Sequence, residues 1–388
     1  MSLREVGWGL FLAGLPFAHF LLPHNIHQWQ AQTLWAQAWL VALFGLSLGQ
    51  TKTTLGNLPL GCWLVWIGLG VLWTWVSYLR KDAGHPVGLL PPFLHCLCVV
   101  IFYLAATTHW TPELLSRLLT WLAYAGLLLV CYGFLQLIHF DQFYKTIDSS
   151  PDLLGRDTVL GTMGNPTHFG SHLALLLPIF LWQPQWPWKI VAVLATLLMV
   201  ATKSTSAIIC GWAVWMLWGF FETAWLGWAI GAAGLVVGGA VFLANREWFN
   251  PSGRWEAWQA FWQHYLVGDH KHQITGAGLG RVMLDSSQQY PGWPSAGSEK
   301  WRHIHNEPFQ VLIEQGIVGL GLVGWGLFHV IQRWWRLPKT ATAKTLAGIG
   351  IVFLLSSLTN FPAHFWVLAS LGLVAYCGVY VLSHAEVV

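Results

Sequence analysis

Long apolar runs separated by short polar stretches recur from one end of the chain to the other. A helix of about 20 mostly apolar residues is long enough to cross a membrane. The pattern therefore predicts an all-α polytopic membrane protein with about twelve spanning helices. These are expected at residues 6–22, 32–48, 60–79, 88–107, 118–140, 166–182, 188–202, 205–221, 223–244, 306–331, 343–361 and 364–383.

Composition supports this interpretation. Of the 388 residues, 55% are hydrophobic and only 9% are charged, whereas about 25% are charged in a typical soluble domain. The 28 tryptophans suit a chain with many membrane–water crossings, because the indole ring prefers that interface. A net charge of +3 gives no reason to expect a nucleic-acid partner.

Two polar stretches, residues 141–165 and 245–304, interrupt the apolar pattern. They separate five predicted spans in residues 1–140, four in 166–244 and three in 305–388. With the N-terminus inside, most basic residues of the short loops fall on the cytoplasmic side, as the positive-inside rule requires. An even number of spans then puts the C-terminus inside and both polar stretches in the periplasm.

Within the second polar stretch, residues 251–267 have aromatic side chains at helical spacing: Trp255, Trp258, Phe261, Trp262 and Tyr265. The pattern predicts an amphipathic helix. Such a helix could lie on the outer membrane surface, or its aromatic face could pack on the transmembrane bundle. Both arrangements keep Arg254 near the level of the lipid headgroups.

The chemistry-bearing segment is residues 302–321, RHIHNEPFQVLIEQGIVGLG. Asn306 is suited to cap a helix and Pro308 to its first turn, so His305 is expected just before a helix at the membrane surface. Three glycines should let this helix approach a neighbour closely: Gly316, Gly319 and Gly321.

Two carboxylates of the same segment are expected at or inside the start of this membrane helix. Ionisable groups there are costly and usually functional. Glu307 could instead lie at a solvated interface, and Glu314 could be a paired structural carboxylate.

His305-Asn306, nine residues, Gly316, two residues and Gly319 together resemble the signature of the O-antigen ligase superfamily. Its members are O-antigen ligases, O-antigen polymerases and protein oligosaccharyltransferases. Four further stretches within about 155–325 are similar to family segments: GTMGNPTHFGSHLALLLP at 161–178, ATKSTSA at 201–207, PSGRWEAWQAFW at 251–262 and ITGAGLGRV at 274–282.

The resemblance implies transfer of a glycan from undecaprenyl diphosphate to a hydroxyl acceptor, with inversion at the anomeric carbon and without metal or cofactor. Neutral histidine is a suitable base for the acceptor hydroxyl, and His305 is the candidate. Cations must bind the diphosphate. The candidates are Arg254, Lys203, Arg156, Arg281 and Arg302, with Asn306, Glu307, Asn165 and His303 in supporting roles. His168 and His172, four residues apart, could hold a metal, but no third ligand is evident nearby.

The expected location is the bacterial inner membrane, with membrane lipids around the helices and the site facing the periplasm. Chain length fits a ligase or a polymerase better than a protein-glycosylating member, and a ligase with lipid A-core as acceptor is the prediction. An O-antigen polymerase and a protein O-oligosaccharyltransferase are the alternatives. A secondary transporter is a remote one, because the polar residues gather in one outer loop and not at the membrane midplane.

Overall fold

The computed structural model describes residues 2–18, 28–45, 65, 90–138, 140, 159–244, 254–267, 270–279, 282, 304–360 and 362–385. Every secondary-structure element in these ranges is a helix. Four helices in this part of the chain are long and apolar enough to cross a membrane: Pro112–Leu137, Thr205–Glu222, Glu307–Arg336 and Trp366–Ala385. The fold is therefore that of an all-α membrane protein.

The N-terminal part contains α1 (Leu3–Gly14), which continues into η1 (Leu15–Phe17), then α3 (Gln28–Gly45), α5 (Leu90–His109) and α6 (Pro112–Leu137). Ser2 and Glu5 form a capping box at the start of α1, which satisfies two backbone donors there. Trp8 of α1 is fully buried, with Phe102 of α5 and Trp110 against its ring. This aromatic cluster joins α1 to α5.

The central helix is α9 (Pro166–Trp182), in which every residue from His168 to Trp182 is buried. Its neighbours approach through small residues. A Cβ added at Gly126 of α6 would lie 2.6 Å from Phe180, and one at Gly348 of α17 (Ala341–Ser357) would lie 2.7 Å from Pro178. Close backbone approach of this kind is how helices pack in a membrane, where lipid supplies no hydrophobic driving force between them.

Next to α9 lie α10 (Pro187–Ala201) and α11 (Thr205–Glu222), and α12 (Ala224–Ala244) packs on α11. The outer face of α12 is apolar and exposed, with Trp225 70% and Trp228 71% exposed. Such a face is suited to lipid.

The remaining elements are α13 (Arg254–Phe261), the π-helical turn η5 (Trp262–Val267), α14 (His270–Thr275), α16 (Glu307–Arg336), η6 (Pro362–His364) and α18 (Trp366–Ala385). The aromatic face of α13 packs on the first half of α16. Phe261 is fully buried with Ile313, and Trp258 lies against the same cluster. The structure thus places this aromatic face against the first half of α16, and a position on the membrane surface stays a prediction.

A kink at Gly316, with φ 67° and ψ −172°, divides α16 into two helical segments. Carbonyls near the kink accept hydrogen bonds from the loop after α14: Ala277 N–H donates to Ile313 O at 2.7 Å, and Gly278 N–H donates to Glu314 O at 3.0 Å. The two backbones are in direct contact, because a Cβ at Gly316 would lie 2.2 Å from the carbonyl oxygen of Ile274. The kink and the loop therefore depend on each other.

The expected close approach is confirmed at Gly316, whose neighbours are Ile274 in the last turn of α14 and Gly276 just after it. The same expectation is wrong for Gly321, because no atom lies within 4 Å of an added Cβ there. The expected capping of the helix is confirmed, since the Asn306 side chain accepts from Phe309 N–H and Pro308 lies in the first turn.

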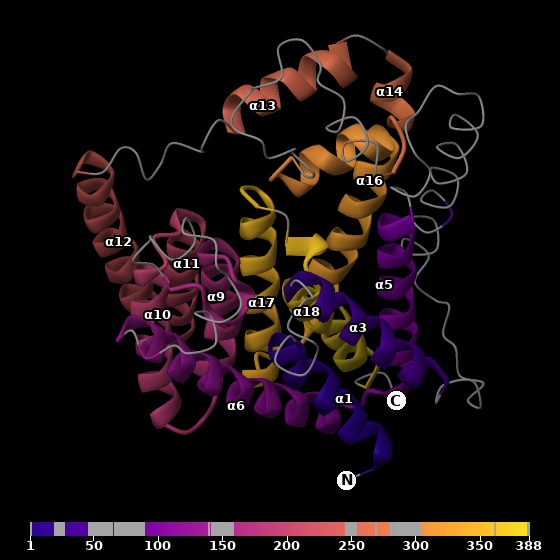
Figure 1. The fold of residues 1–388 in the computed structure, drawn as a ribbon. Coiled ribbons are helices and arrows are strands. Elements are labelled where there is room, and N and C mark those ends of the chain that lie inside the picture. The colour runs from indigo at the N-terminus through magenta and orange to yellow at the C-terminus, as the bar shows by residue number, and fades with distance from the viewer. Residues whose placement is uncertain are drawn as a thin grey trace.

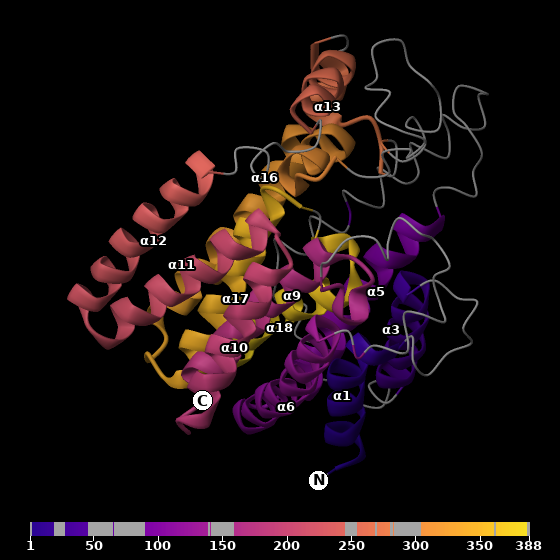
Figure 2. The ribbon, with the colours of Figure 1, turned by 60° about the vertical axis from the view of Figure 1, so that its left-hand side comes forward.

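Each predicted span overlaps an observed helix except 60–79, of which the structure describes only residue 65. Figures 1 and 2 show α13, α14 and the first half of α16 at one end of the molecule, with both chain termini toward the other end. Helices α9 and α11 run away from the first end and α10 and α12 toward it. Which side of the membrane each end faces stays a prediction.

Replacement of Gly316 by alanine should destabilise the protein by roughly 1–3 kcal/mol or more, because a side chain is strained at this φ and ψ and meets backbone atoms. Gly321→Ala is the matched control on the same helix, where an added methyl meets nothing and alanine favours the helix. Thermal unfolding of both purified variants in detergent measures the difference. Equal midpoints for the two variants would contradict the tight contact at Gly316.

Candidate functional site at the start of α16

His305 immediately precedes the cap of α16 and has φ 56°. A residue with a side chain pays roughly 1–3 kcal/mol for such a conformation, which persists only where the surroundings enforce it and which concentrates at functional sites. The imidazole is partly exposed, and its Nδ1 is buried. The backbone is thus fixed while part of the ring remains accessible.

Both neighbours of His305 are held by hydrogen bonds. On one side, the Asn306 side chain caps α16 and donates from Nδ2 to Leu358 O at 2.9 Å. On the other side, Ile304 N–H donates to Gln310 Oε1 at 3.4 Å, and Ile304 O accepts from Trp258 Nε1 at 2.7 Å. Three parts of the chain, α13, α16 and the end of α17, therefore determine where His305 lies.

Glu307 is buried, with 8% of its surface exposed, and its Oε1 accepts from Ala363 N–H at 2.9 Å and from His364 Nδ1 at 3.0 Å. A solvated interface, one alternative for this carboxylate, is therefore wrong. The pair fastens η6 to the first turn of α16.

Burial opposes charge on His364, but the charge and the hydrogen bond of Glu307, together with the charge of Glu314, outweigh it and raise the pKa of His364 above 6.5. Glu314 is itself buried and accepts from Gln310 Nε2 at 3.5 Å. This contact agrees with its interpretation as a paired structural carboxylate.

Lys203 lies in the turn between α10 and α11 and has φ 54°. Among the described residues, Lys203 and His305 are the two non-glycine residues with positive φ. Each directly precedes a helix cap, since Ser204 caps α11 through its hydroxyl. The ammonium-bearing side chain is exposed.

Asn165 begins α9, where its Oδ1 accepts from Thr167 N–H at 2.9 Å and from His168 N–H at 3.3 Å. The preceding turn is held by Gln136 of α6, whose Oε1 accepts from Gly161 N–H at 2.7 Å. These bonds account for Asn165 as the residue that shapes the start of α9.

Contacts connect these segments across the same end of the molecule. A Cβ at Gly170 would lie 2.8 Å from Thr202 Oγ1, which places the first turns of α9 beside the turn that holds Lys203. The ring of His168 lies 3.9 Å from that of Phe365. Because His364 in turn contacts Glu307, the starts of α9, α11 and α16 surround one region.

Several residues predicted for the site lie wholly or partly outside the described part of the chain. Arg254 is the first residue of α13, but its side chain is outside the described part. Arg156, Arg281, Arg302 and His303 also lie outside the described residues. Their roles stay predictions. No group of three or more His, Cys, Asp or Glu that could hold a metal occurs in the part of the chain that is described.

Three residues of the site escaped sequence reasoning: Gln310, His364 and, as an anchor for Ile304, Trp258. A histidine at the first position of the predicted span 364–383 was the available clue to His364. Nothing along the chain relates Gln310 to Ile304, because a helix cap and a folded loop bring them together.

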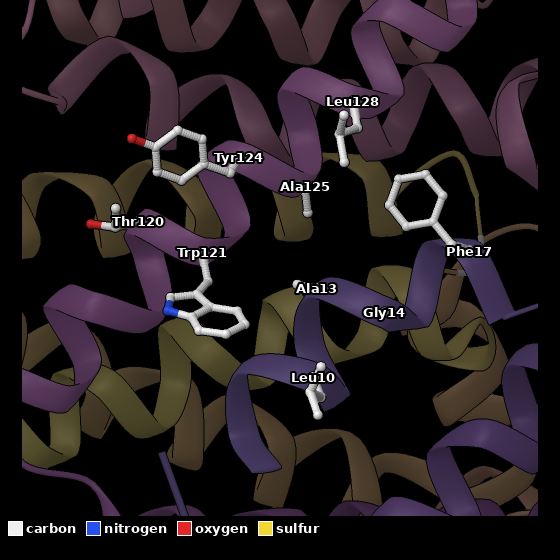
Figure 3. A pocket seen from close by; sticks show the side chains of 9 residues that line it. All are labelled: Leu10, Ala13, Gly14, Phe17, Thr120, Trp121, Tyr124, Ala125 and Leu128. Carbon is white, nitrogen blue, oxygen red and sulfur yellow. The ribbon is translucent and has the colours of Figure 1, made fainter. Parts of the chain in front are cut away.

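A groove of about 430 Å³ lies elsewhere, between α1 and α6 (Figure 3). Leu10 and Phe17 line one side, and Trp121 and Leu128 the other, with the Tyr124 hydroxyl at its edge. It offers no charged group to a diphosphate. The groove is therefore not part of the candidate site.

Fold and site together define a helical membrane protein with a strained histidine before α16 and an exposed, strained lysine before α11. Residues 190–324 match the family model described as O-antigen ligase, which supports placement of the chain in the O-antigen ligase superfamily. The match includes Lys203 and His305 but not the 161–178 stretch. No match occurs among curated proteins.

The Glu307–His364 pair predicts a pH dependence of stability. Because the folded-state pKa of His364 is raised, its contribution is fully present below the unfolded pKa of about 6.5 and is lost as pH rises through the folded pKa. Unfolding midpoints of the wild type should therefore fall over this range relative to those of Glu307→Gln, which keeps an acceptor without charge. If the unfolding midpoints of the two proteins depend on pH in the same way, the ion pair is contradicted.

Proposed function

We propose that the chain transfers a glycan from undecaprenyl diphosphate to lipid A-core on the periplasmic face of the bacterial inner membrane. Glycosyl transfer of the O-antigen ligase or polymerase type is what the family match supports in general. The observation that carries the proposal is the conformation of His305, which is strained, held on both sides and partly exposed inside the matched segment.

In this proposal His305 acts as the base. It takes the proton of the acceptor hydroxyl as the oxygen attacks the anomeric carbon of the donor. The bond from that carbon to the diphosphate oxygen breaks, and undecaprenyl diphosphate leaves with the electron pair. Attack from the opposite face inverts the anomeric carbon. A diphosphate leaves as an anion, so the reaction needs positive charge near it more than it needs an acid.

Lys203 is the described cation best placed for that role, since its turn lies beside the first turns of α9 and it precedes α11. The N-terminal ends of α9, α11 and α16 add partial positive charge in the same region. Arg254 and the other arginines predicted from the sequence would supplement it.

The direct test measures transfer by purified protein with undecaprenyl-diphosphate-linked glycan and lipid A-core in EDTA. His305→Ala should lower the transfer rate by about 10²–10⁴-fold, the usual contribution of a general base. His329→Ala, in the second segment of α16, is the matched control and should retain the rate. Wild-type activity in His305→Ala would overturn the assignment of the base.

The product of the wild type separates the possible acceptors. Glycosylated lipid A-core indicates a ligase. A longer lipid-linked glycan indicates a polymerase instead. If donor binds and neither product forms, a protein acceptor should be tested next.

Loss of the Lys203 charge should weaken donor binding roughly tenfold or more, as expected for a charge-assisted hydrogen bond to phosphate. Lys203→Asn is the informative variant because asparagine tolerates positive φ, so the change removes charge without adding strain. Lys344→Asn serves as control, since Lys344 lies over the Phe221 ring at the opposite end of α11. Donor titrations in detergent compare them, and unchanged affinity in Lys203→Asn would remove Lys203 from the site.

A further inference from the structure

The Gln310 side chain joins the peptide before His305 to the ion pair that binds η6. Its Oε1 accepts from Ile304 N–H at 3.4 Å. A backbone N–H can only donate, so this bond fixes which end of the amide is oxygen. Gln310 is buried, with 4% of its surface exposed.

The nitrogen end of the same amide faces two acceptors. Nε2 lies 3.5 Å from Glu314 Oε1 and 3.3 Å from His364 Nε2. The second contact is a hydrogen bond only if His364 Nε2 carries a lone pair. In that state the imidazole is neutral, its proton is on Nδ1, and Nδ1 donates to Glu307. In the series of hydrogen bonds Ile304–Gln310–His364–Glu307, each donor then faces an acceptor.

A second proton on His364 breaks this match, because Nε2–H would then face the Gln310 amino group. Turning the amide would present Oε1 to His364, but it would also set the amino group against Ile304 N–H. One of the two contacts must be lost. Loss at Ile304 releases one of the bonds that hold His305 in its strained conformation.

We propose that Gln310 and His364 are positioning residues for His305, and that a proton on His364 displaces the His305 peptide through the Gln310 amide. The proposal rests on the proposed function, in which His305 is the base. It adds a second titrating group to the reaction, one that acts on the geometry of the base and does not touch the substrate.

The groups around His364 determine whether its imidazole is charged or neutral. Glu307 and Glu314 face it from α16, and His95 of α5 stacks on it with ring centroids 6.2 Å apart. His95 Nε2 also contacts Ala363 O at 2.6 Å. The two carboxylates favour the proton and raise the pKa of His364, whereas the Gln310 amide favours the neutral ring.

The pH dependence of transfer tests this coupling. Two groups must be deprotonated in the wild type, so the logarithm of the rate should rise on the acid side with a slope approaching about 2. In His364→Asn the slope should fall to about 1, because asparagine can still donate to Glu307 but does not titrate.

Gln310→Met keeps the size of the side chain and removes both hydrogen-bonding ends. It should lower kcat roughly tenfold or more, as expected when a reacting group is displaced, with KM for the donor unchanged. Gln32→Met is the matched control, since Gln32 is also a buried glutamine, 2% exposed, and contacts Met163. Wild-type kcat in Gln310→Met, or an unchanged slope in His364→Asn, would overturn the proposal.

Hydrogen exchange of the Ile304 amide provides a measurement independent of turnover. Exchange should be faster in Gln310→Met than in the wild type or Gln32→Met, and in the wild type protection should increase with pH after correction for the intrinsic rate. If this holds and the wild type transfers no glycan, the proposed function fails and the coupling stands. If transfer occurs and Ile304 exchange is the same in all variants, the coupling fails and the function stands.

Discussion

Inside a membrane protein, backbone groups released by a break in a helix must find partners within the protein, because lipid offers none. The kink at Gly316 meets this demand with two amides of the loop after α14, Ala277 and Gly278. Their bonds join the start of α16 to a segment that precedes it by about thirty residues in the matched family region. The position of the first half of α16, and of everything attached to it, depends on this contact.

The same requirement explains how a strained residue persists before α16. His305 has φ 56°, and the residues on both sides of it are hydrogen-bonded to α13, α16 and the end of α17. These bonds hold the strained conformation in place. In the proposed function, a base held in this way does not have to be ordered when substrate arrives, which lowers the cost of reaching the reactive geometry.

Charge in the region is arranged in two layers. Glu307, Glu314 and His364 form an inner layer in which carboxylates and imidazole offset one another. Lys203 stands apart from them in an exposed turn, at the start of α11. An anionic donor would meet the cation and the helix N-termini before the carboxylates, which are buried. In the proposed function, this separation lets the acidic groups position the base without repelling a diphosphate.

The sequence by itself determined the helical membrane class, most helix positions and the cap at Asn306, because apolar run length and capping chemistry are local properties. It also marked Gly316 as a point of close approach, without identifying the neighbour. Tertiary structure alone decided that this neighbour is the end of α14 at Ile274, that α13 packs on α16, and that Gln310 links Ile304 to His364. Most of those contacts join residues that are far apart in the chain, and the contact of Ile304 with Gln310 crosses the start of α16. Such contacts depend on the path that the folded backbone takes, so no spacing along the sequence predicts them.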